Sequence, residues 1–224
     1  HYLETTGMQK GEKRTEAKEL VDYLKIMAKD AMIENKNLFL QDSSKEAQDR
    51  LWMFEDYVQD GMDSQFFNPN FKNRAVSELT QHYNSEVIRL IQENTPESWQ
   101  DALYMSEKII RMNEEYPCVY DTFACNAAVS RHRPEHLDAY VYNLSALYVV
   151  GQKDESLATV DSFLARFYPG GNYAYDQNDP LLASRTIKMV EKAYLYSRAF
   201  AYDSQMGSDM GSYERYMCRA LDYL

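Results

Sequence analysis

A five-residue string in the middle of the chain has the residue types and the spacing of a zinc site. His132-Arg133-Pro134-Glu135-His136 fits the pattern H-x-x-E-H. When this pattern lies on a helix, the two histidines bind zinc from neighbouring turns and the glutamate acts as general base toward a metal-bound water. Glu214, 78 residues after His136, is where a third ligand would be sought. The string by itself therefore indicates hydrolytic chemistry.

The residues around this string argue against that chemistry. Pro134 fits only the first turn of a helix, so we expect His132 to precede the helix and not to share a face with His136. Arg131 and Arg133 would repel a dication. We therefore predict no metal, no cofactor and no catalytic residues. A zinc metallopeptidase, which the string resembles, is the most remote alternative.

No other pattern in the sequence nominates an active site. There is no glycine-rich phosphate loop and no set of nucleophile, base and orienting residue, so we predict that the chain is not an enzyme. Cys118, Cys125 and Cys218 have neither zinc nor redox spacing and are expected to be small buried hydrophobes. Asn143-Leu144-Ser145 is a glycosylation sequon. It falls inside a predicted helix, where no sugar is expected.

Tyrosines are the residues that we expect to contact other proteins. A segment between two predicted helices carries Tyr168, Tyr173 and Tyr175 and is neutral to acidic. Tyrosine buries a large area at an interface for little loss of entropy. We predict these three as interaction residues, together with Tyr142 and Tyr148 on an earlier helix. The open alternative is that the rings of this loop pack over the adjacent helix ends.

The composition excludes several classes of protein. The 224 residues include 24 basic and 35 acidic side chains, which give a net charge of −11. Nucleic-acid binding and polybasic membrane attachment both need clustered positive charge, so neither is expected. Only 8 glycines and 6 prolines are present, too few for the many turns of a sandwich or barrel. No apolar run reaches the length of about 18 residues that a membrane span requires.

Hydrophobic spacing and helix boundary signals predict an all-α fold. Proline marks the start of three helices and the end of two, at Pro96, Pro134, Pro180, Pro117 and Pro169. We expect an extended arm over residues 1–14, a pair of helices over 15–65, a loop at 68–70 and one helical region over 71–224. Within that region the expected helices cover roughly 71–93, 95–116, 119–130, 134–151, 154–168, 180–203 and 213–224.

One segment of this region, residues 138–169, combines small, aromatic and turn residues in a regular order. The residues concerned are Leu144, Ser145, Tyr148, Gly151, Ser156, Val160, Phe163 and Pro169. Their order resembles a tetratricopeptide repeat, a unit of two antiparallel helices. Residues 102–117 match the second helix of the same repeat in part, although Phe163 stands where that family usually has alanine. The resemblance implies an irregular α-solenoid of antiparallel helical hairpins.

The resemblance also implies a function in binding other proteins. We expect a non-enzymatic scaffold, an accessory subunit of a larger multi-protein assembly, without direct nucleic-acid contact or a transmembrane segment, and able to lie beside a membrane complex. The alternative is a stand-alone adaptor that binds peptides. The chain begins at His1 rather than Met, which we interpret as a processed start. This favours an organelle such as the mitochondrion, with a bacterial envelope as the alternative.

Overall fold

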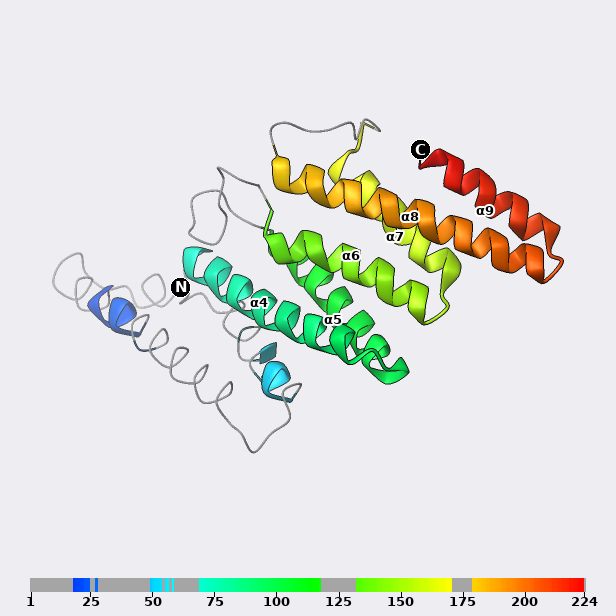
Figure 1. Cartoon of the computed structure of the whole chain (residues 1–224). Helices are drawn as coiled ribbons and strands as arrows, with labels where there is room; N and C mark the ends of the chain where they lie inside the picture. The colour runs from blue at the N-terminus through cyan, green and yellow to red at the C-terminus, as the bar shows by residue number, and fades with distance from the viewer. Residues whose placement is uncertain are drawn as a thin grey trace, which may run out of the picture. The chain divides into compact units, whose positions relative to one another are not determined.

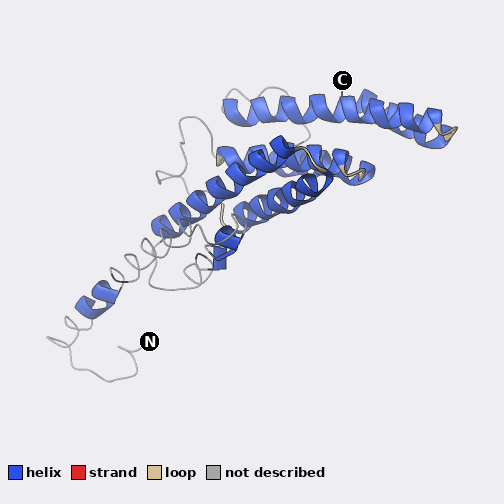
Figure 2. Ribbon diagram, turned by 60° about the horizontal axis from the view of Figure 1, so that its bottom comes forward, coloured by secondary structure: helices blue, strands red, loops and turns tan. Residues whose placement is uncertain are grey.

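The computed structural model describes residues 18–24, 27, 49–53, 55–56, 58, 69–117, 132–170 and 179–223. Within these ranges every regular element is an α-helix and none is a strand, so the predicted all-α class is confirmed (Figure 2). The labelled helices of Figure 1 are α4 (Pro69–Glu93), α5 (Pro96–Glu115), α6 (Pro134–Val149), α7 (Lys153–Phe167), α8 (Pro180–Met206) and α9 (Met210–Asp222).

The chain forms two compact units, His1–Leu79 and Thr80–Leu224, and the boundary between them falls inside α4. In the first unit, the described residues that precede α4 are helical. Leu51 and Val58 are buried there, whereas Leu20 and the apolar side chains near it are exposed. The predicted arm over residues 1–14 and most of the predicted helical pair lie outside the described residues.

Three predicted helix starts are confirmed at the prolines that mark them. Pro96, Pro134 and Pro180 are each the first residue of their helix. At α5, Thr95 Oγ1 accepts a hydrogen bond from the Ser98 N–H at 3.1 Å, and Ser98 Oγ accepts one from the Thr95 N–H at 2.9 Å. This reciprocal capping box satisfies two backbone donors that the first turn would otherwise leave unpaired.

Other helix boundaries differ from the prediction. α4 begins at Pro69, inside the predicted loop, because proline is accepted in the first turn of a helix. α8 continues to Met206, and α9 begins as early as Met210 because the side chain of Asp209 caps its first turn. The predicted helix over 119–130 lies outside the described residues.

One cysteine also departs from the prediction. Cys218 is an exposed free thiol rather than a buried hydrophobe. The reason is its position on α9, about half a turn from Tyr216 and Ala220, which carry the buried face of that helix. Cys118 and Cys125 lie outside the described residues.

In the second unit, helices α5 to α9 pack against one another. α5 contacts α6, α6 contacts α7 and α8, and α8 contacts α7 and α9 (Figure 1). The main core lies among α6, α7, α8 and α9, with Leu144, Phe163 and Phe200 among its buried side chains. A smaller cluster, of which Leu103 and Leu147 are part, joins α5 to α6.

The segment that resembles a repeat forms a hairpin of α6 and α7. Gly151 has φ = 83° in the turn, a left-handed conformation that glycine adopts without a steric penalty. Four residues of the pattern, Leu144, Ser156, Val160 and Phe163, are completely buried. Antiparallel helix pairs of this kind occur in many helical proteins, so the repeat family and the solenoid stay predictions.

Candidate functional site

The H-x-x-E-H string lies at the start of α6. His132 precedes the helix and Arg133 is its N-cap residue, as the proline predicts. The rings of His132 and His136 both lie against Phe167, with ring centroids 4.8 and 5.9 Å from it. Glu214 is an exposed residue of α9. No group of three His, Cys, Asp or Glu side chains that could hold a metal occurs in the described part of the chain.

Arg133 is buried, with 1% of its surface exposed, and ties the start of α6 to α5. Its Nη1 donates to Asn113 Oδ1 at 2.6 Å and to the backbone oxygen of Tyr116 at 2.9 Å. Asn113 Nδ2 in turn donates to Thr80 Oγ1 of α4 at 3.1 Å. Burial lowers the pKa of Arg133 to about 10, and the charge of Glu135 opposes this shift. The guanidinium is therefore still charged at neutral pH, and its polar contacts hold three helices together.

His136 is a buried, neutral imidazole. It packs against Tyr140 and Phe167, and its Nε2 has no hydrogen-bond partner among the described residues. Burial, together with the positive charges of Arg166 and Arg133, lowers the pKa of His136 to about 3. In the folded chain this histidine stays uncharged down to acidic pH, which suits a packing role better than a catalytic one.

The buried imidazole makes the stability of the chain depend on pH. The pKa of His136 is about 3 in the folded chain, against its ordinary value of 6.5. The unfolded chain therefore binds more protons below pH 6.5, and the free energy of unfolding falls as the pH drops from 6.5 toward 3. We expect a loss of about 2 kcal/mol between pH 7.5 and pH 5.0, at about 1.4 kcal/mol per pH unit below 6.5, measured by urea denaturation.

The variant His136→Leu is the control for this dependence, since it keeps an apolar side chain at the site and removes the titrating group. Between pH 7.5 and pH 5.0 the free energy of unfolding of the variant should fall by about 2 kcal/mol less than that of the wild type. Equal losses in the two proteins would show that His136 is accessible to protons in the folded chain.

Asn143, the asparagine of the sequon, is buried where α5, α6 and α7 meet. Its Nδ2 donates to Ser106 Oγ of α5 at 3.3 Å, and its Oδ1 accepts a hydrogen bond from Thr159 Oγ1 of α7 at 3.1 Å. A glycan on Nδ2 would break the first of these bonds and would need space that the packed helices occupy. The folded chain therefore does not present the sequon, in agreement with the expectation from its place within a helix.

Two of the predicted interaction tyrosines pack within the second unit. Tyr148 of α6 stacks on Tyr196 of α8, with the ring centroids 3.9 Å apart and the rings nearly parallel. The hydroxyl of Tyr168, just after α7, shares a hydrogen bond of 2.9 Å with Thr186 Oγ1 of α8. Both rings are half-buried. Much of the surface of each ring is therefore buried against α8. For Tyr168 this agrees with the alternative that the ring packs over an adjacent helix end.

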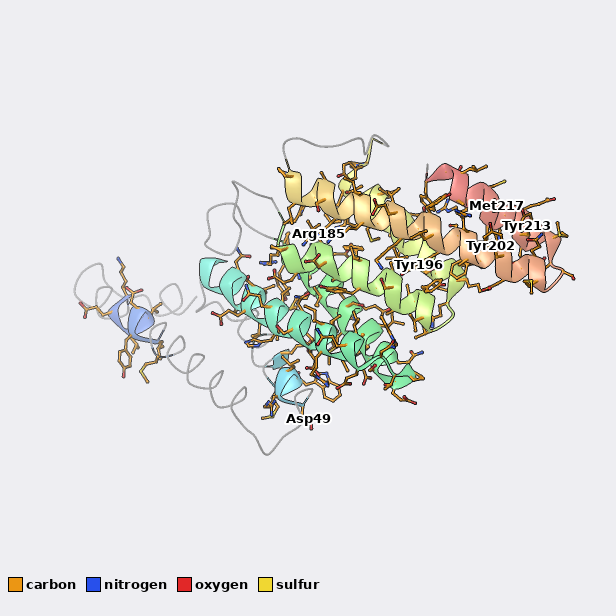
Figure 3. The ribbon with its side chains drawn as sticks, in the orientation of Figure 1. Asp49, Arg185, Tyr196, Tyr202, Tyr213 and Met217 are labelled. Atoms are coloured by element: carbon orange, nitrogen blue, oxygen red, sulfur yellow. The ribbon has the colours of Figure 1, made fainter. Side chains whose placement is uncertain are left out.

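Of the other three predicted tyrosines, Tyr142 alone lies within the described residues. Tyr142 is half-buried near the ion pair of Asp138 and Arg185, the latter labelled on α8 in Figure 3. In that pair Arg185 Nε and Nη2 donate to the two carboxylate oxygens at 2.6 and 3.0 Å. Burial and the charge of Asp138 raise the pKa of the Tyr142 hydroxyl. Tyr173 and Tyr175 lie outside the described residues, so the role of all five stays a prediction.

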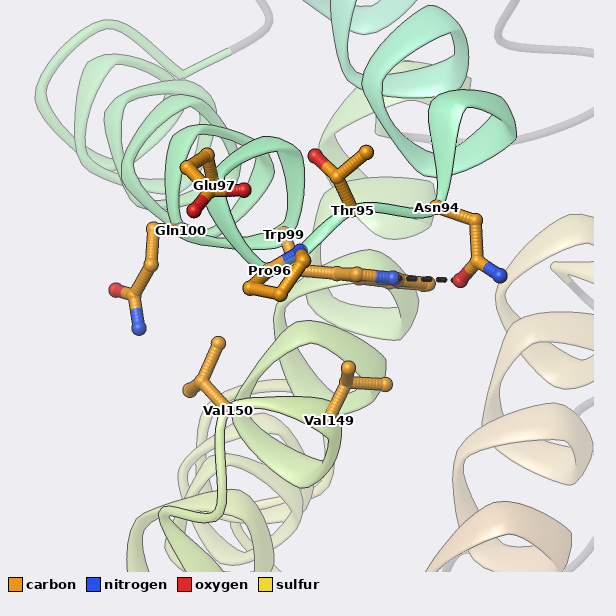
Figure 4. Close-up of a pocket in the computed structure, with 8 residues that line it drawn as sticks. All are labelled: Asn94, Thr95, Pro96, Glu97, Trp99, Gln100, Val149 and Val150. Carbon is orange, nitrogen blue, oxygen red and sulfur yellow. Dashed lines mark hydrogen bonds between the residues drawn. The ribbon is translucent and has the colours of Figure 1, made fainter.

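An open groove, which the sequence did not indicate, lies where the start of α5 meets the end of α6. Its volume is about 490 Å³, within the usual range for a ligand pocket. Eight residues line it: Asn94, Thr95, Pro96, Glu97, Trp99, Gln100, Val149 and Val150 (Figure 4). The side chains of Pro96, Trp99, Val149 and Val150 make its surface largely apolar.

The indole of Trp99 is held in a fixed orientation at this groove. Its Nε1 donates to Asn94 Oδ1 at 2.9 Å, the bond drawn in Figure 4. Asn94 has φ = 53°, a left-handed conformation that asparagine tolerates better than most residues. The ring also packs against Leu103, Ala146 and Leu147 of the α5–α6 core. The orientation of the indole on this side of the groove is therefore set by contacts within the chain.

The lining residues suit binding better than catalysis. Among the described residues that line the groove, Glu97 is the one carboxylate, and none is a histidine, cysteine or lysine. The hydroxyl of Thr95 is used in the capping box. The boundary signal Thr95-Pro96-Glu97 correctly predicted the start of α5. Nothing in the sequence showed that residues 149 and 150 would lie opposite Trp99.

No protein-family model, no curated protein and no solved structure matches this chain. A membrane span would need a long apolar helix, and no helix in the described ranges is both long and apolar enough to be one.

Proposed function

We propose that the chain is a non-enzymatic scaffold that binds other proteins, as an accessory subunit of a larger assembly. The groove beside Trp99 is the observation that carries this proposal. Interfaces are commonly centred on an aromatic side chain that is already held in its bound orientation, because little entropy is then lost on binding. Trp99 meets this condition through its hydrogen bond to Asn94 and its contacts with the α5–α6 core.

The lining of the groove defines the chemistry of the partner that fits it. Val149 and Val150 offer apolar surface opposite the indole, which favours an aliphatic or aromatic side chain of the partner. Glu97 is exposed at the rim, and the chain as a whole carries a net charge of −11. A basic residue next to the inserted side chain would therefore be attracted to this site. The partner is a protein segment with an apolar anchor and a basic flank.

Replacing Val149 with aspartate tests this function. Val149 is exposed at the end of α6, so the substitution should leave the fold intact while placing a charge on the apolar side of the groove. Partners are first captured from native extract with the tagged full chain and identified by mass spectrometry. Affinity is then measured with the purified partner. We expect the Val149→Asp variant to bind about 30-fold more weakly than the wild type, the loss typical of a central interface residue.

Ile88→Asp is the matched control, because Ile88 is also a β-branched aliphatic residue exposed on a helix, but on α4 and outside the groove. It should bind as the wild type does. If Val149→Asp and Ile88→Asp bind the partner with equal affinity, the groove is not the binding site. The size of the native complex distinguishes a subunit of a large assembly from a stand-alone adaptor. A large particle supports a subunit, and recovery as a single stable protein supports the stand-alone peptide-binding adaptor.

A further inference from the structure

α8 carries apolar side chains on the face that points away from the core. Ile187, Leu195 and Tyr202 are 51%, 57% and 51% exposed. They recur at i, i+8 and i+15, which places them on one side of the helix. The buried residues of α8, such as Met189, Ala193 and Phe200, lie on the opposite side. A helix that is apolar on both sides is normally covered on both. We call the outward residues, with Glu191, Tyr194 and Arg198 between them, the α8 stripe.

The two charges of the α8 stripe have no oppositely charged partner in the described chain. Arg198 lies between two tyrosines, and its Nη1 and Nη2 donate to the hydroxyls of Tyr194 and Tyr202 at 3.2 Å each. These bonds hold the guanidinium on the outward face and leave its other donors unused. Glu191 is exposed, and no ion pair joins it to any described residue. Glu191 and Arg198, seven residues apart, are thus one negative and one positive side chain on an apolar surface.

The α8 stripe is complementary to a reversed copy of itself. If a second α8 lies antiparallel on the first, with the midpoint between residues 194 and 195 as the centre, Ile187 falls opposite Tyr202 of the second copy. In the same register Glu191 falls opposite Arg198, and Leu195 falls opposite Tyr194. An interface across a two-fold axis needs this property, since each contact must occur twice with the roles exchanged.

We propose that a second copy of this chain binds the α8 stripe, antiparallel, about a two-fold axis at the midpoint of residues 194 and 195. Residues 187–202 span about 22 Å of helix, and two such faces bury the apolar and aromatic side chains at the centre. Each end of the contact then has one Glu191–Arg198 ion pair between copies. Self-association goes beyond the proposed scaffold function and does not depend on the groove, which lies on α5 and α6.

Sedimentation velocity of the full chain, at concentrations from about 1 to about 100 µM, tests this inference. The wild type should reach twice the mass of the chain. Arg198→Glu and Glu191→Arg alone each place like charges opposite each other, and each should weaken the dimer about tenfold or more. The double variant Glu191→Arg/Arg198→Glu restores opposite charges only in the antiparallel register. It should recover the wild-type dissociation constant to within about threefold.

A second pair of variants keeps the test independent of the ion pair. Leu195→Asp should weaken the dimer about tenfold or more, whereas Leu221→Asp, on the exposed side of α9, should leave it unchanged. A double charge variant that associates no better than the single ones would overturn the proposed register. A wild type that stays monomeric at every concentration would overturn the proposed dimer, and the α8 stripe would then be covered by a different protein. Circular dichroism of each variant confirms that it is folded.

Discussion

Replacing Phe163 with alanine should lower the free energy of unfolding by about 4 kcal/mol. Phe163 of α7 is completely buried, and its ring packs against Tyr140 and Phe167 at centroid distances of 5.3 and 4.7 Å. The substitution leaves a cavity in the main core of the second unit. The cost is the lost burial of the ring and the lost contacts of the atoms around it. Urea denaturation followed by circular dichroism measures the effect.

This prediction opposes what the family resemblance implies. Alanine is the usual residue at this position of a tetratricopeptide repeat, so the resemblance implies that Phe163→Ala is tolerated. If the helices closed over the gap, the loss would be below about 1 kcal/mol, and the packing seen around Phe163 would not be what stabilises the hairpin. Phe163→Leu is the intermediate control. It retains most of the volume and should cost about 1 kcal/mol.

Replacing Arg133 with methionine should lower the free energy of unfolding by about 3 kcal/mol. Methionine is of similar length and relieves the cost of burying a charge, but it donates no hydrogen bond. The carbonyl oxygens of Asn113 and Tyr116 then lose the donor they share, at 2.6 and 2.9 Å. Since Asn113 is itself buried, its Oδ1 is left without a partner, and this penalty exceeds the gain from removing the charge. The loss is measured by urea denaturation at neutral pH.

A double-mutant cycle shows whether the loss of stability in Arg133→Met comes from its hydrogen bond to Asn113. Arg133→Met combined with Asn113→Leu replaces both polar partners by apolar groups, so it should cost less than the sum of the single changes by about 1 kcal/mol or more. Arg111→Met on the exposed side of α5 is the matched control and should change the free energy of unfolding by less than about 0.5 kcal/mol. Strictly additive costs in the cycle would show that Arg133 and Asn113 act independently.

The helices could be predicted from sequence because their signals are local. Pro96, Pro134 and Pro180 each begin a helix, since proline lacks only the N–H that the first turn leaves unpaired. The boundaries that differed depend on capping contacts, such as the Asp209 side chain that caps α9. The prediction that Cys218 is buried was wrong, because burial on α9 depends on which face of the helix packs against α8.

The candidate sites were much less predictable. The H-x-x-E-H string drew attention to His132 and His136, and the proline inside it correctly indicated that His132 precedes the helix. The groove received no prediction, because Trp99 and Val149 are 50 residues apart and meet only through the packing of α5 on α6. The α8 stripe is visible as spacing in the sequence, but that spacing does not tell which of two apolar faces is buried.

The sequence by itself determined the all-α class and the starts of α5, α6 and α8, because these follow from residue types within a few positions of each other. The tertiary structure alone decided where the polar groups find partners. Arg133 reaches Asn113, Asn143 joins three helices, and Tyr148 stacks on Tyr196. Such contacts join residues 16 to 48 positions apart. They depend on how helices pack, which no local pattern specifies.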